Sequence, residues 1–84
     1  MTLADSTRAV SELRARALAR ALPPPEECRA IRLRAGVATK ELAEALGVSA
    51  MALRNWEAGR RETQRRYRER YAAALRILAG DDDA

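Results

Sequence analysis

The 84-residue sequence has no histidine, no phenylalanine and a single cysteine, Cys28. One cysteine excludes an internal disulfide and a cysteine-based zinc site, and the lack of histidine excludes histidine-based zinc sites and acid–base catalysis. No carboxylate pair, activated serine or glycine-rich phosphate loop indicates catalysis. We therefore expect no enzyme activity, no metal and no cofactor, and we expect Cys28 to be a small core or boundary residue.

Residues that favour β-strands are also scarce. Of the apolar residues, 19 are Ala and 10 are Leu, whereas three are Val, two are Ile and only 4% of the chain is aromatic. Because Ala and Leu are strong helix formers, the composition predicts one compact all-α domain. No apolar run approaches the ~18–20 residues of a membrane span, and the N-terminal residues lack the features of a signal peptide. We expect a cytoplasmic protein with no membrane partner.

The charge is biased towards cations. Sixteen Lys and Arg residues oppose twelve Asp and Glu residues, for a net charge of +4, and fifteen of the sixteen cations are Arg. A small domain this basic favours a nucleic-acid or other anionic partner. A GC-rich genome produces the same arginine bias, so charge alone leaves both interpretations open.

Proline and glycine divide the chain into segments. Ser6 is the predicted N-cap of a first helix that runs to about Leu22, where residues 23–25, all proline, end it. We predict an N-terminal helical extension over residues 1–22, a main domain over 23–80 and a disordered acidic tail over 81–84.

Four more helices are predicted in the main domain, which gives a five-helix bundle. They span about Pro25–Ala35, Thr39–Leu46, Ala50–Ala58 and Thr63–Leu78, and glycines follow them. The second and third of these four form a helix-turn-helix. Gly47 supplies the turn, and Ser49 is the N-cap of the next helix.

The helix over residues 50–58 has one side suited to burial and one suited to contact. Leu53 and Trp56 share its inner side, and Ala43 is small where the two motif helices approach. The residues that remain outward form a continuous strip and are Ala50, Met51, Arg54 and Asn55. Such a strip suits a helix that enters the major groove of DNA.

Residues 31–49, together with Asn55–Arg61, resemble the lambda repressor-like (XRE-type) helix-turn-helix family. The resemblance covers about residues 25–79, and the segment around Tyr71 resembles phage and actinobacterial members. It implies base contacts from Ala50, Met51, Arg54 and Asn55. It also implies phosphate contacts from Thr39, Lys40, Ser49, Arg60 and Arg61, and a structural ion pair between Arg32 and Glu57. The chain departs from the family where Ser or Thr and then Gln are common, since it has Ala38 and Thr39, and it has Ala50 where a long polar residue is usual.

Two functions remain open at this level. The first is a sequence-specific, double-stranded DNA-binding transcriptional regulator that reads the major groove with helix 50–58. The alternative is a protein-interaction module, antitoxin-like or adaptor, which the additional helix 6–22 and the polar-poor strip favour. A homodimer through either end helix is expected of the first function, whereas a first helix folded back on the core predicts a monomer.

Overall fold

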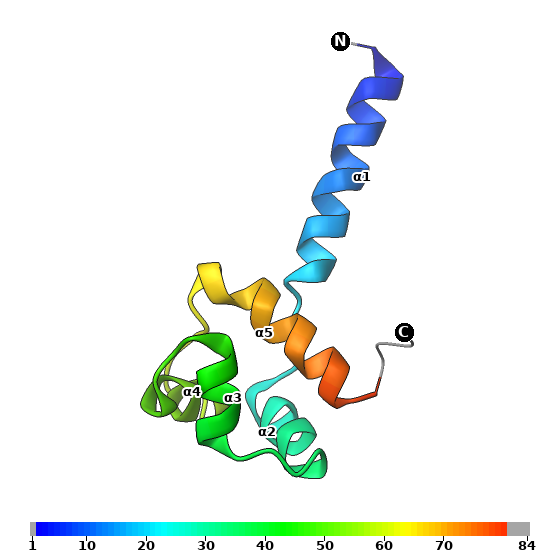
Figure 1. The fold of residues 1–84 in the computed structure, drawn as a ribbon. Coiled ribbons are helices and arrows are strands. Elements are labelled where there is room, and N and C mark those ends of the chain that lie inside the picture. Colours follow the sequence, from blue (N-terminus) through cyan, green and yellow to red (C-terminus); the bar gives the residue numbers. More distant parts are fainter. Residues whose placement is uncertain (1, 81–84) are drawn as a thin grey trace.

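The computed structural model describes residues 2–80, which contain five helices and no strand (Figure 1). The helices are α1 (Leu3–Ala19), α2 (Pro25–Arg34), α3 (Thr39–Leu46), α4 (Ala50–Glu57) and α5 (Arg65–Leu78). The predicted all-α fold, with five helices and a helix-turn-helix formed by α3 and α4, is confirmed. The predicted acidic tail lies outside the described residues.

The predicted ends of α1 were wrong. The N-cap is Thr2, whose side chain accepts a hydrogen bond from the Asp5 backbone N–H at 3.2 Å, so Ser6 lies inside the helix. An acidic residue in the first turn also favours this earlier start, because the helix N-terminus attracts negative charge. The helix ends at Ala19, before the predicted Leu22.

The start of α5 also differs from the prediction. Its first residue is Arg65, with Gln64 at the N-cap position, whereas the prediction began at Thr63. Thr63 is buried in the preceding loop, and its carbonyl oxygen accepts a hydrogen bond from Arg68 Nε at 3.1 Å. This local hydrogen bond, between residues five apart in the chain, links the loop to the first turn of α5.

The hydrophobic core lies between α2, α3, α4 and α5. Its largest fully buried side chains are Leu46, Leu53, Tyr71 and Leu75. The Trp56 ring packs against Tyr71 at a centroid distance of 5.5 Å. Cys28 is buried, as expected, and its thiol donates a hydrogen bond to the Pro23 carbonyl oxygen at 3.4 Å. Burial raises the pKa of both the Cys28 thiol and the neighbouring Tyr71 hydroxyl, so both groups stay protonated.

A left-handed glycine and two hydrogen bonds stabilise the turn between α3 and α4. Gly47 ends α3 with φ at +78°, a left-handed conformation that glycine adopts at low cost. The Val48 N–H donates to the Ala43 carbonyl oxygen at 3.0 Å, and Arg70 Nη1 of α5 donates to the Leu46 carbonyl oxygen at 2.8 Å. The long helix α5 thus helps to set the angle between α3 and α4.

Helix α1 stands apart from this core. It rises from the α5 side and extends away from α3 and α4 (Figure 1), and none of its residues is buried. The radius of gyration is 15.1 Å, whereas a compact domain of this length has about 12 Å. No helix within residues 2–80 is long and apolar enough to cross a membrane.

Candidate nucleic-acid interface

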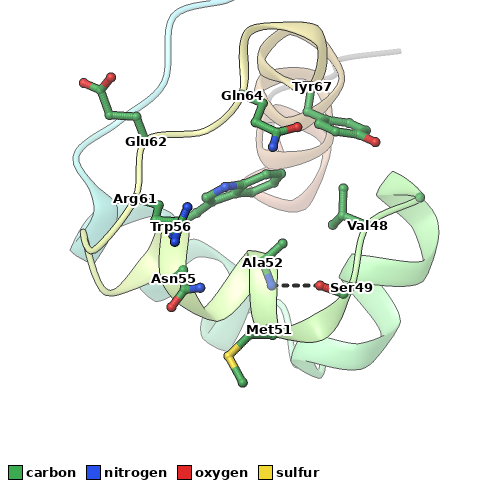
Figure 2. Close-up of a pocket in the computed structure, with 11 residues that line it drawn as sticks. Val48, Ser49, Met51, Ala52, Asn55, Trp56, Arg61, Glu62, Gln64 and Tyr67 are labelled. Atoms are coloured by element: carbon green, nitrogen blue, oxygen red, sulfur yellow. Dashed lines mark hydrogen bonds between the residues drawn. The ribbon is translucent and has the colours of Figure 1, made fainter.

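Helix α4 begins at a well-formed N-cap. The Ser49 side chain accepts a hydrogen bond from the Ala52 backbone N–H at 3.0 Å (Figure 2). This bond satisfies one of the free N–H groups of the first turn, as the sequence predicts. Leu53, with no exposed surface, and Trp56 attach the inner side of α4 to the core. The opposite side of α4 is therefore held in one orientation.

A buried ion pair holds the other end of α4 to α2. Arg32 Nε and Nη2 donate to the Glu57 carboxylate oxygens at 2.7 Å and 2.9 Å, and Arg32 Nη1 donates to the Val37 carbonyl oxygen at 2.9 Å. Both side chains are more than nine-tenths buried, and the hydrogen bonds to Glu57 raise the pKa of Arg32. The structure thus brings together the two residues that the family resemblance paired, and the bidentate geometry restricts rotation of α4.

The outward side of α4 is centred on Met51. This side chain is 59% exposed and points away from Trp56 and the core (Figure 2). Arg54 is exposed and Asn55 is half-buried. Ala50, which the sequence placed in the same outward strip, is half-buried and packs against the core. Its methyl group is consequently less available for contact than the sequence indicated.

An open groove runs along one side of α4. Met51, Ala52 and Asn55 of α4 line it, together with Ser49 at the N-cap (Figure 2). The segment after α4 forms the opposite wall. The residues of that wall include Arg61, Glu62, Gln64 and Tyr67. Ala52, Glu62 and Gln64 were not among the predicted site residues, because the helical spacing did not show that this loop returns beside α4.

A basic cleft lies on the other side of α4. Arg54, Arg60 and Thr39 line it, and so does Arg29 of α2. The buried Arg32–Glu57 pair forms part of the same cleft, so its two charges offset each other and the three other arginines set the local potential. Sequence reasoning missed Arg29, because α2 has no contact motif and the approach of Arg29 to α4 is a tertiary feature.

The other predicted phosphate-binding residues lie close to the two ends of the motif. Lys40 is exposed in the first turn of α3. Arg60 and Arg61 are exposed after Gly59, and their backbone N–H groups donate to the Asn55 carbonyl oxygen at 3.0 Å and 3.4 Å. These bonds keep the two arginines next to α4.

Comparison with known proteins identifies the family to which this chain belongs. A family model described as helix-turn-helix matches residues 29–77, which include α3, α4 and nearly all of α5. The protein belongs to the XRE-type, lambda repressor-like helix-turn-helix family. It is a DNA-binding helix-turn-helix regulator, a class that is not typically enzymatic. Searches of curated proteins and of solved structures gave no significant match to the chain. Helix α1 lies outside the matched segment.

Proposed function

We propose that this helix-turn-helix protein is a sequence-specific transcriptional regulator that inserts α4 into the major groove of double-stranded DNA. The observation that carries the proposal is the mounting of α4. Its inner side is held by Leu53, Trp56 and the buried Glu57, while Met51 and Arg54 are exposed. An α-helix with its side chains is about 10–12 Å in diameter and the major groove is about 12 Å wide, so α4 can lie in the groove.

Base contacts are assigned to the outward side of α4. The Asn55 amide suits adenine, which presents an acceptor and a donor side by side, and Arg54 suits the two acceptors of guanine. Met51 and the Ala50 methyl offer apolar contact to a thymine methyl group. Because Ala50 is half-buried, we assign most of the discrimination to Met51, Arg54 and Asn55.

Phosphate contacts are assigned to both sides of α4. The two DNA strands border the major groove, so a helix that lies in it needs cations on each flank. Arg29, Arg60 and Thr39 would hold one strand from the basic cleft. Ser49 and Arg61 would hold the other strand from the groove side, and Lys40 would contact it or its neighbour from the start of α3.

Selection of bound sites from random duplex DNA tests this function. We expect enrichment of a short motif by the wild-type protein and a changed motif for Asn55→Ala. Arg8→Ala, on α1 and away from α4, is the matched control and should select the wild-type motif. Binding to all duplexes without enrichment would overturn sequence-specific reading. The proposed ligand also implies that the protein acts in the compartment that contains the DNA.

A protein-interaction module is the second candidate function. The large exposed apolar side chains of α1, among them Leu3 and Val10, favour it, because they provide a surface that the DNA-binding motif does not need. Direct measurement of binding to a labelled DNA duplex distinguishes the two functions. It is made at about 50 mM salt, because phosphate contacts are stronger at low salt. Absence of binding there would favour the protein-interaction module.

We also propose that the regulator acts as a homodimer. One short helix reads too few base pairs for useful specificity, and dimers of this class place two such helices on successive half-sites. A two-fold symmetric motif in the site selection is the expected sign of a dimer, and a single asymmetric half-site would contradict it.

A further inference from the structure

Helix α1 is long, regular and without an intramolecular partner over most of its length. Its 17 residues include none that is buried, and Leu3, Val10 and Leu13 are 84%, 64% and 57% exposed. An isolated helix of this length is only marginally stable in water, since most helical stability in proteins comes from packing of an apolar face. The helix therefore lacks the contact that would stabilise it.

The exposed surface of the molecule is larger than a compact monomer needs. Its accessible surface is 6096 Å², whereas a compact monomer of 9.3 kDa exposes about 5,000 Å². The excess, about 1,100 Å², is similar to the share of about 800 Å² that each partner buries in a stable interface of standard size. The excess belongs to the chain as a whole, and α1, none of whose residues is buried, contributes surface to it that a second helix could cover.

The apolar residues of α1 follow a heptad pattern. Leu3, Val10 and Ala17 are seven residues apart, and Leu13 follows Val10 by three, which corresponds to the a and d positions of a coiled coil. Leu18 lies on a different side, where it lines an apolar cleft shared with α2 and α5. This cleft does not include Leu3, Val10, Leu13 or Ala17, so these four residues, the heptad seam, stay uncovered.

We propose that the seam formed by Leu3, Val10, Leu13 and Ala17 pairs in parallel with the same seam of a second copy of this chain. The parallel orientation rests on the proposed function. It places both cores, and so both copies of α4, at the same end of the α1 pair, where one duplex can contact them. An antiparallel pair would separate the two cores by the length of α1, about 25 Å, and place them at opposite ends.

Charge is compatible with this self-pairing. In a parallel pair the flanking g position faces the following e position of the partner helix. Ala9 would then face Arg14, and the residue that would follow as the partner of Arg16, Ala21, lies beyond the end of α1, so no two like charges oppose each other across the seam. The side of α1 that carries Arg8 and other charged residues would stay in solvent. Between Leu3 and Ala17 the a and d positions contain no charged side chain, and Ser6, at the first d position, is their one polar residue.

Sedimentation equilibrium of the full chain without DNA tests the pairing, with Leu13→Glu as the disrupting variant. Ala15→Glu, at the outermost f position of the same helix, is the matched control because it adds the same charge. We expect a reversible wild-type dimer and an unchanged control. In Leu13→Glu the dissociation constant should rise about tenfold or more, because pairing would bury a carboxylate. Neither residue is buried, so the Trp56 fluorescence of the core should stay the same.

Three outcomes would overturn the proposal. They are a wild-type monomer up to about 200 μM, an equal effect of the two variants, and a Leu13→Glu dimer as tight as the wild type. Since no DNA is present, failure of the pairing is distinguishable from failure of DNA recognition. Far-UV circular dichroism should also show a helix content that rises with wild-type concentration.

Oxidative cross-linking of Leu3→Cys tests the orientation. The native Cys28 is buried, so the wild-type chain is the control and should not cross-link. Parallel pairing brings the two position-3 cysteines together and predicts a disulfide-linked dimer. A dimer that sediments normally but does not cross-link through position 3 would refute the parallel arrangement.

Discussion

Replacing Glu57 with glutamine is expected to remove a large part of the stability of the domain. Glu57→Gln preserves the side-chain shape but removes the negative charge that faces the Arg32 guanidinium at 2.7 Å and 2.9 Å. Breaking a buried ion pair from one side costs about 3–5 kcal/mol, because an uncompensated charge stays buried. The bond from Arg32 to the Val37 carbonyl oxygen survives, and the glutamine oxygen still accepts one bond, so we expect about 3 kcal/mol.

Urea denaturation followed by Trp56 fluorescence measures this loss. Trp56 is the only tryptophan, it is buried, and it precedes Glu57 in α4. A domain of this size has a total stability on the order of 8 kcal/mol, so a loss of 3 kcal/mol shifts the midpoint clearly while the slope stays constant. DNA binding should weaken in parallel, since the pair fixes α4 to α2.

The double variant Arg32→Met with Glu57→Leu removes both charges. Comparing its free energy of unfolding with that of Glu57→Gln distinguishes the destabilisation by one unpaired buried charge from the net stabilisation by the ion pair. Apolar residues of similar volume often replace a buried ion pair at little cost, so the double variant should lie within about 2 kcal/mol of the wild type. A loss below about 1 kcal/mol in Glu57→Gln, or a double variant that loses more than Glu57→Gln does, would refute this reasoning.

Three further changes test other parts of the structure. Arg54→Ala should weaken binding to the selected site by about 1–3 kcal/mol and leave binding to random duplex nearly unchanged, whereas equal losses on both would make Arg54 a phosphate contact. Arg61→Ala should weaken binding to all duplexes similarly and reduce the slope of log affinity against log salt by about one. Arg76→Ala, near the end of α5, is the control. If the slope is unchanged in Arg61→Ala, Arg61 does not contact phosphate. Tyr71→Phe should not destabilise the fold and should stabilise it by up to about 1 kcal/mol in urea denaturation. The buried Tyr71 hydroxyl has no partner within hydrogen-bond distance in residues 2–80, and the neighbouring Cys28 thiol is a weak hydrogen-bonding group. A loss above about 1 kcal/mol would show that this hydroxyl is bonded.

Local features of the sequence were sufficient to predict the helix-turn-helix. The α3 boundaries were predicted without error, and those of α2 and α4 to within one residue. Gly47 and the Ser49 cap were also identified, because each depends on the chemistry of a residue and its immediate neighbours. The burial of Leu53 and Trp56 follows from helical spacing, which assigns a side chain to one face of its helix.

Features that involve separate elements could not be predicted in this way. Arg29 joins Arg54 in the basic cleft although 25 positions separate them, and Ala50 is half-buried because neighbouring elements cover part of it. The burial of Thr63 in the loop before α5 is another feature of this kind, because other elements of the fold cover it. Spacing along one helix contains no information about which other element approaches each face.

The amino-acid sequence by itself determined the helices, the turn at Gly47 and the inner side of α4, because short-range sterics, capping and periodicity govern them. The tertiary structure alone decided which charges meet at the two flanks of α4 and that α1 extends away from the core. The angle between α1 and α2, which meet through residues 20–24, decides whether the apolar side of α1 is covered. That angle depends on how α2 and α5 pack.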